Sequence, residues 1–516
     1  MNLLKTLSAI TSMTMLSRIT GLMRDTLFAW TFGANAFSDA FNIAFRLPNL
    51  LRRLFAEGAF AQAFVPILSE YKARDGHDET HLLVDHVGSV LLWSTVAVSL
   101  LGIVAAPLLI MWIGSGLNKT PGAYDAAVLM TRFMFPYIAF MSFVALAGGV
   151  LNTWRQFKIP AITPVLLNVA QILGATLLAP RLAQPIYAMA FSVMVGGALQ
   201  VAVQVPSLMK IGMLPRITFR LGAALRDSGV RRVLRKMGPA VFAVSAAQIS
   251  LLINTSIAAS LAAGSVTALT YADRLMEFPT AMLGVALGTV LLPSLAKANT
   301  EGNTAEYSAL LNWGVRLTFL LALPAAVGLA VLANPMIATL FHNGHFRAED
   351  IHTSAMPLMA YSAGLLGIIM VKTLAPAFYA RQEVRTPVNI ALGVLVVTQI
   401  LNQVFVPFIG VAGLALSIGT GACINASLLY VGLRRRGIFV PEPGWWPFFL
   451  RLLVAVTVLG LVCYAGAAQV DWIAMKAHAI MRAVLLLLII GAGAIAYFAV
   501  LFALGFRVAD FKRMGH

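Results

Sequence analysis

Eight charged side chains lie close together in an otherwise apolar stretch near the start of the chain. They are Arg18, Arg24, Asp25, Asp39, Arg46, Arg52, Arg53 and Glu57. A charge at the centre of a bilayer costs roughly 2.5–3.5 kcal/mol on insertion scales, so these groups need a polar cavity or partners. A guanidinium stays charged and presents a planar fork that grips two phosphate oxygens. The pattern predicts a protein that holds or moves something charged inside a membrane, and the arginines favour a phosphate-bearing anion.

A second charged group, Asp273, Arg274 and Glu277, lies just before a proline in the other half of the chain. Pro48 interrupts the first charged stretch and Pro279 follows the second. A proline removes one helical hydrogen bond and clashes with the preceding turn. Paired helix breaks in two halves of a transporter indicate its binding site, so we expect both prolines to act as hinges there. The alternative is an ordinary kink, which membrane helices tolerate.

The spacing within the first stretch predicts which charges share a helical face. Seven- and four-residue steps align Asp39, Arg46, Arg53 and Glu57. Arg52 falls off this line, so periodicity prefers Arg53 as a cavity-facing residue. The alternative is a web of internal salt bridges that only stabilises the helical hairpin, because the carboxylates supply partners for the arginines.

The elements that position these residues are apolar spans. Of 516 residues, 59% are hydrophobic and 11% are charged, against about 25% charged in a soluble protein. Segments of about 20 residues with few charges predict an all-α polytopic membrane protein. We expect about fourteen spans: 8–32, 37–67, 86–113, 127–151, 160–180, 185–206, 237–262, 269–294, 312–333, 354–378, 387–407, 411–433, 446–468 and 481–505.

The net charge of +17 reflects topology. With the N-terminus inside, 22 of the 37 basic residues fall in cytoplasmic loops or termini, and 4 fall in outside loops. This asymmetry predicts that both termini are cytoplasmic and that the inner face contacts anionic lipids. Nucleic-acid binding is not expected.

A weak internal repeat with an offset of about 227 residues predicts the domain organisation. VPILSE at 65–70 resembles LPSLAK at 292–297, and RQFKIP at 155–160 resembles RQEVRTP at 381–387. We expect two six-helix lobes, 1–206 and 237–436, related by a parallel repeat. Two additional helices and a basic tail occupy 437–516.

The basic connection at 207–236 links the two predicted lobes. Leu221, Leu225 and Val233 can share one face of an amphipathic helix on the membrane surface. A solvated basic linker is the alternative.

No constellation of residues predicts an enzyme. The chain has no glycine-rich phosphate loop followed by Lys-Ser/Thr, so direct use of ATP is not expected. The histidines near 77–86 and 342–352 are expected in solvated loops, and neither a metal site nor a cofactor is predicted. The alternatives to the reading given by the family resemblance below are a related exporter of another polyprenyl-linked oligosaccharide or a drug, and a membrane enzyme acting on polyprenyl diphosphate.

Several long motifs resemble the MurJ (MviN) family of lipid II flippases, within the multidrug/oligosaccharidyl-lipid/polysaccharide exporter superfamily. They are SMTMLSRITGLMRD at 12–25, FRLPNLLRRLFAEGAFAQAFVPILSEYK at 45–72, LNTWRQFKIP at 151–160, YADRLMEFP at 271–279 and GVALGTVLLPSLAK at 284–297. The resemblance implies a bacterial inner-membrane protein that flips the undecaprenyl-diphosphate-linked peptidoglycan precursor by alternating access. It implies a monomer that acts near cell-wall synthesis proteins.

The resemblance also implies roles for individual residues. Spans 1, 2, 7 and 8 would line a central cavity, and spans 13 and 14 would form a groove for the lipid tail. The diphosphate-binding arginines would be Arg18, Arg24, Arg52 and Arg274. Acidic cavity positions match Asp39, Glu57 and Glu277, and we add Asp25, Arg53 and Asp273 as charge partners. The family pattern prefers Arg52 to Arg53, and we follow it. Sodium coupling is not expected, because Asn254 and Asn389 in spans 7 and 11 are uncharged.

Overall fold

The computed structural model describes residues 3–52 and 59–507. The described residues are helical and contain no β-strand. They form two compact units, Met1–Thr267 and Ala268–His516, which we describe one at a time. The lobe boundaries expected from the sequence repeat remain predictions.

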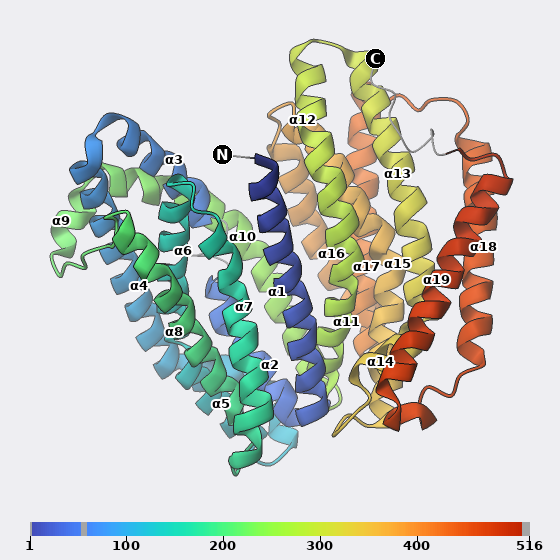
Figure 1. Ribbon diagram of the computed structural model, residues 1–516, viewed down its shortest axis with the longest axis horizontal. Coiled ribbons are helices and arrows are strands. Elements are labelled where there is room, and N and C mark those ends of the chain that lie inside the picture. Colours follow the sequence, from blue (N-terminus) through green and yellow to red (C-terminus); the bar gives the residue numbers. More distant parts are fainter. Residues whose placement is uncertain (1–2, 53–58, 508–516) are drawn as a thin grey trace. The chain divides into compact units, whose positions relative to one another are not determined.

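The first unit contains ten α-helices in its described part (Figure 1). They are α1 (Leu3–Phe32), α2 (Ala36–Arg52), α3 (Ala59–Arg74), α4 (Gly76–Ile113), α5 (Ala123–Met134), α6 (Tyr137–Thr153), α7 (Lys158–Leu173), α8 (Tyr187–Lys210), α9 (Leu221–Arg226) and α10 (Ser228–Ser260). Helix α7 packs between α1 and α8, α2 packs on α5, and α10 packs on α3 and α4.

The second unit takes up the rest of the chain, and its first helix begins at the end of the first unit. Its helices are α11 (Ser265–Pro279), the π-helix η5 (Thr280–Val285), α12 (Ala286–Thr300), α13 (Thr304–Val331), α14 (Ala333–Phe341), α15 (Ala348–Tyr379), α16 (Arg385–Ile409), α17 (Val411–Arg435), α18 (Trp445–Ala468) and α19 (Ala479–Ala503). Helix α15 is central to this unit, because it packs on both α13 and α17.

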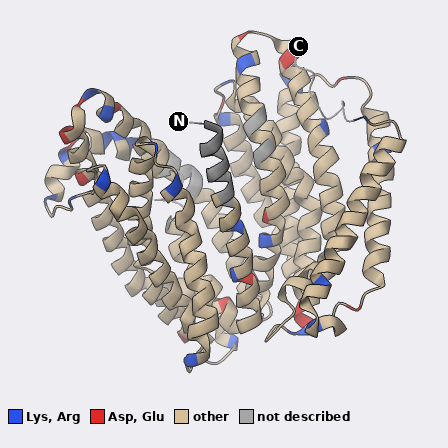
Figure 2. Ribbon diagram, in the orientation of Figure 1, with Lys and Arg blue, Asp and Glu red and all other residues tan. Residues whose placement is uncertain are grey.

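Ten helices of the described part are long and apolar enough to cross a membrane, and they coincide with ten of the predicted spans. Helix α4 shows the environment they need, since Leu101, Val104 and Leu108 are 69%, 78% and 66% exposed. A run of exposed apolar side chains of this kind is favourable against lipid. The four other predicted spans fall on α1, α2 with α3, α10, and α11 with α12. The described residues of the two charged groups lie on α1, α2 and α11, and charged positions interrupt the tan ribbon of α1 (Figure 2).

Glycines permit a close crossing of α15 and α17 in the second unit. A Cβ atom on Gly364 of α15 would lie 2.0 Å from the Cα of Gly419 on α17, and one on Gly367 would lie 2.6 Å from the backbone nitrogen of Cys423. Neither contact is sterically possible, so only glycine allows α15 and α17 to approach this closely.

A buried arginine fixes the start of α19. Arg482 is fully buried, and its guanidinium donates to the carbonyl oxygens of His342 at 3.0 Å and Trp472 at 3.4 Å. His342 follows the last residue of α14, so Arg482 places a cation at the negative end of that helix.

The same unusual helix end recurs once in each half of the chain. Arg155 after α6 and Gln382 after α15 have φ values of 59° and 58°, the only non-glycine residues with positive φ in the described part. In each case the N–H of the next residue donates to a carbonyl five residues before it. Gln156 donates to Leu151 at 2.8 Å, and Glu383 donates to Phe378 at 3.0 Å. The following helices begin three residues later, at Lys158 and Arg385. The two ends are separated by 227 residues, the offset of the sequence repeat.

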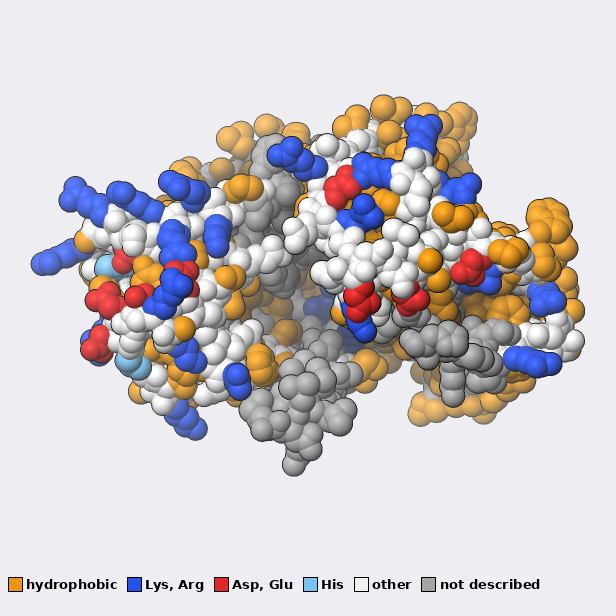
Figure 3. Space-filling view, turned by 90° about the horizontal axis from the view of Figure 1, so that it is seen from above, with side chains coloured by type: hydrophobic (Ala, Val, Ile, Leu, Met, Phe, Trp, Pro, Cys, Tyr) orange, Lys and Arg blue, Asp and Glu red, His pale blue; other side chains and the backbone are white. Residues whose placement is uncertain are grey.

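The basic connection forms two helices, and Asp227 divides them. The Asp227 carboxylate accepts from the N–H groups of Gly229 and Val230 and so caps α10. Val233 is buried, whereas Leu225 is exposed and lies on the other helix, so the two residues do not share one helical face as expected from the sequence for 207–236. Basic side chains gather at this end of the first unit (Figure 3).

Candidate functional site

Arg24 is the most strongly positioned of the predicted arginines. Its side chain is 13% exposed, and its Nε and Nη2 donate to Asp25 Oδ1 at 2.9 Å and 2.6 Å. Its Nη1 donates to Asn168 Oδ1 at 3.0 Å. A guanidinium has five N–H donors, so these three bonds leave two donors for another acceptor. Arg24 is therefore both fixed in place and able to bind an anion.

Arg18 lies partly buried on the same helix, six residues before Arg24. It makes no hydrogen bond or ion pair with any residue that the structure describes. A partly buried guanidinium that bonds none of the described residues can bind an anionic ligand through all its N–H groups. The short step between the two arginines brings two cations to one stretch of α1.

Asn168 is a residue that the sequence reasoning missed. It lies on α7 and is 6% exposed. Its Nδ2 donates to the Ser17 carbonyl at 3.0 Å and to Thr20 Oγ1 at 3.1 Å, while its Oδ1 accepts from Arg24. The signal available in the sequence was an amide inside an otherwise apolar span at 160–180.

Asp39, predicted as an acidic cavity position, accepts hydrogen bonds from the start of α11. It is 3% exposed, and its carboxylate accepts from Gly264 N at 2.7 Å, Thr267 N at 2.8 Å and Thr267 Oγ1 at 2.7 Å. These donors belong to the start of α11, where backbone N–H groups lack helical partners. Asp39 therefore caps a helix that begins more than two hundred residues later, and the cap accounts for an acid at this depth.

The remaining charges of the first stretch are only partly described. Arg46 on α2 donates to the hydroxyl of Thr255 on α10. Pro48 is buried inside α2, and the helix continues beyond it to Arg52. The Arg52 side chain, Arg53 and Glu57 lie outside the described residues.

In the second unit, α11 carries both an aromatic contact and a group of charged residues. The ring of Tyr271 stacks on that of Phe341 at 4.4 Å. Arg274 pairs with Glu277 at 3.1 Å, and their side chains are 43% and 55% exposed. Asp273 is partly buried beside them. The aromatic anchor holds α11 while its arginine and acids remain accessible.

Lys372 adds a cation to this group that the sequence reasoning did not single out. It lies on α15, and its Nζ donates to the carbonyl of Thr280 at 3.4 Å. Thr280 opens the π-helix η5 directly after Pro279, so the predicted hinge coincides with a real change of helix type. π-Helical turns are frequent at functional sites. Lys372 thus adds a cation beside Thr280, close in sequence to the Asp273, Arg274 and Glu277 group of α11.

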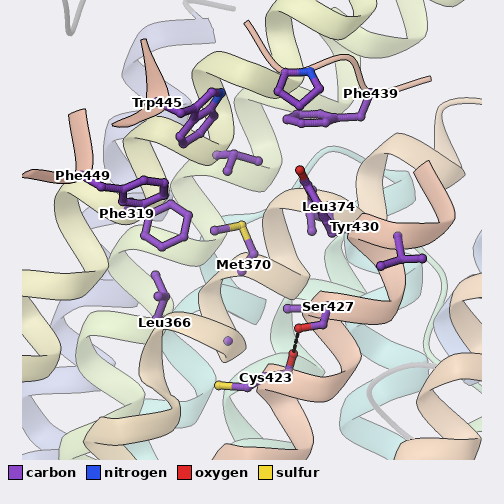
Figure 4. Close-up of a pocket in the computed structure, with 15 residues that line it drawn as sticks. Phe319, Leu366, Met370, Leu374, Cys423, Ser427, Tyr430, Phe439, Trp445 and Phe449 are labelled. Carbon is purple, nitrogen blue, oxygen red and sulfur yellow. Dashed lines mark hydrogen bonds between the residues drawn. The ribbon is translucent and has the colours of Figure 1, made fainter. Parts of the chain in front are cut away.

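The second unit also contains an open apolar pocket of about 520 Å³ (Figure 4). Phe319 of α13, Met370 of α15, Cys423 of α17 and Trp445 of α18 line it. The Ser427 hydroxyl beside them donates to the Cys423 carbonyl at 2.8 Å, so its hydrogen is already bonded without a ligand. The volume of the pocket is typical of small-molecule sites, and its apolar lining suits a segment of hydrocarbon chain.

Comparison with known proteins decides the family. The sequence profile described as "Lipid II flippase MurJ" matches residues 28–504. A Burkholderia cenocepacia protein described in the same words is 53% identical over 513 residues, covering 99% of each chain. The chain belongs to the MurJ family. A Haemophilus influenzae protein described as "Probable lipid II flippase MurJ" is 40% identical, covering 96% of this chain and 98% of that one.

Solved structures establish the fold. A lipid II flippase MurJ in an inward closed conformation matches with a TM-score of 0.79 at 23% identity, covering 96% of this chain and 99% of that one. A MATE family multidrug resistance transporter in an inward-facing conformation matches with a TM-score of 0.67 at 15% identity, covering 83% and 97%. The family indicated by the sequence motifs is thus confirmed. The all-helical, multi-pass inner-membrane character follows from the ten apolar helices and the family.

Proposed function

We propose that this protein flips lipid II, the undecaprenyl-diphosphate-linked peptidoglycan precursor, from the inner to the outer leaflet of the cytoplasmic membrane. The observation that carries the proposal is the 53% identity over nearly the whole chain to a protein described as a lipid II flippase. The activity is transport, so no covalent chemistry is assigned to any side chain.

The diphosphate binds to the arginines in this proposal. Among the described residues, Arg18 has no hydrogen-bond partner and Arg24 keeps two N–H donors that bond nothing, which supports the assignment. Arg52 and Arg274 complete the set. The charges that balance it are Asp25, Arg53, Glu57, Asp273 and Glu277, and Asp39 contributes by holding the start of α11.

The lipid tail occupies apolar surface beside the two C-terminal helices. The pocket between α13, α15, α17 and α18 supports this part of the proposal, because most of the side chains that line it are apolar and the Ser427 hydroxyl already donates to a backbone carbonyl. A polyprenyl chain makes no hydrogen bonds, so such a wall costs it nothing.

The proposed architecture has fourteen spans, two parallel six-helix repeats and cytoplasmic termini. The repeat is supported by the two helix ends with a positive backbone φ, at Arg155 and at its counterpart Gln382. Transport follows alternating access by a monomer, with Pro48 and Pro279 as hinges and anionic lipids at the basic inner face. The substrate must bind the two states with different affinity, since equal affinity shifts no population.

The decisive test is outer-leaflet exposure of lipid II in cells depleted of this protein and rescued with variants. Wild type should restore exposure, and Arg24→Ala should fail at normal membrane abundance. Arg132→Ala is a matched control, because this exposed arginine of α5 donates to the Ile103 carbonyl and to no other residue in the described part of the chain. Unchanged exposure after depletion would refute the proposed function. Loss of the Arg24→Ala protein itself would favour a salt-bridge role for the arginine.

A further inference from the structure

We infer that Asn168 on α7 is a positioning residue that sets the direction of the Arg24 guanidinium toward its anionic ligand. The inference rests on the proposed function, because it assigns Arg24 to the diphosphate. It adds a neutral residue from a span that carries none of the charged motifs.

The hydrogen bonds of Asn168 leave its side chain no alternative orientation. Arg24 has only donors, so it must face the amide oxygen, and the Ser17 carbonyl has only acceptors, so it must face the amide nitrogen. Both Nδ2 hydrogens are used, on Ser17 and on Thr20 Oγ1. Since Ser17, Thr20 and Arg24 all lie on α1, the amide bonds to three residues of that helix and fixes the arginine side chain relative to the helix.

A neutral acceptor at this position has an electrostatic consequence. Asp25 already places one carboxylate against Arg24, with the shorter bond at 2.6 Å. A second carboxylate would make the local charge negative and repel a diphosphate. An amide oxygen holds the remaining edge of the guanidinium without adding charge, so the arginine stays oriented and can still bind an anion.

The role predicts an order among variants that a packing role would not give. Purified, monodisperse protein should be titrated with lipid II, and binding should be competed with inorganic pyrophosphate. Asn168→Ala should weaken lipid II binding by about tenfold, because a hydrogen bond to a charged group is lost. Asn168→Asp has nearly the same size as asparagine, yet it should weaken binding further, because it adds a negative charge.

Two further variants separate positioning from packing. Gln200→Ala removes a comparable buried amide, which donates to the Thr163 carbonyl of α7 at 3.1 Å without contacting Arg24, and it should leave affinity unchanged. Arg24→Ala combined with Asn168→Ala should bind no more weakly than Arg24→Ala alone, because Asn168 acts through Arg24.

The outcomes distinguish this inference from the proposed function. If Arg24→Ala weakens binding while Asn168→Asp binds like wild type, or if the double variant shows additive losses, the positioning role is refuted. If wild type binds no lipid II, or Arg24→Ala binds it fully, the arginine site of the proposed function fails instead.

Discussion

Replacing Asp39 with alanine is expected to destabilise the folded protein. The substitution removes the acceptor for three donors, Gly264 N, Thr267 N and Thr267 Oγ1, at 2.7, 2.8 and 2.7 Å. The site is almost completely buried, so water cannot replace the carboxylate. An unsatisfied buried donor costs roughly 1–3 kcal/mol. Allowing for partial relaxation, we expect a loss of about 3–5 kcal/mol for the three together.

The assay is thermal unfolding of the purified protein in detergent, followed by the fraction that remains monodisperse, together with abundance in the membrane. Asn303→Ala is the control, since Asn303 is an exposed cap that bonds one N–H of α13, and it should cost about 1 kcal/mol. Asp39→Ala protein that melts like wild type but no longer transports would refute the reasoning. Asp39 would then act as a charge in the transport pathway.

Three other predictions concern single residues. Arg24→Lys should reach normal abundance but bind lipid II more weakly, because an ammonium lacks the fork that bridges Asp25 and the ligand; wild-type affinity would contradict this. Burial lowers the pKa of His342, with help from the positive charges of Lys476 and Arg482. The unfolded chain therefore binds more protons below its ordinary pKa of about 6.5, and stability should fall as pH drops through that value. His342→Gln should flatten the pH dependence of melting measured between pH 5 and 8. Arg482→Leu should lower thermal stability by about 2–4 kcal/mol, since two buried carbonyls lose their donor; an unchanged melting temperature would show that they find other partners.

The sequence was sufficient to locate the apolar spans, because their signal is local. Ten predicted spans coincide with long apolar helices, and the offset of 227 residues reappears in the matched helix ends. Hydropathy and repeats depend on residue type and spacing alone. Both signals can therefore be read without knowing the tertiary contacts of the chain.

The partners of the polar residues could not be predicted, since they depend on tertiary contacts. Asn168 lies 144 residues from Arg24, and an uncharged amide in an apolar span attracts no notice. Asp39 followed the periodicity of a cavity-facing residue, yet it caps α11. The connection at 220–238 has an amphipathic pattern, but Asp227 stops one helix and starts the next. Lys372 could not be singled out either, because its contact is with the carbonyl of Thr280 in the π-helix η5, 92 residues earlier in the chain.

The cap formed by Asp39 also affects how the protein is made. Its first acceptor contact is with Gly264, 225 residues later in the chain. At a synthesis rate of roughly 5–20 residues per second, about 10–45 seconds separate the two. In the proposed fourteen-span arrangement, in which α2 crosses the membrane, the Asp39 carboxylate has no α11 to cap throughout that interval. The nascent chain must therefore keep this carboxylate hydrated or neutral, and the ribosome's progress to residue 267 sets the earliest moment at which α2 can reach its final environment.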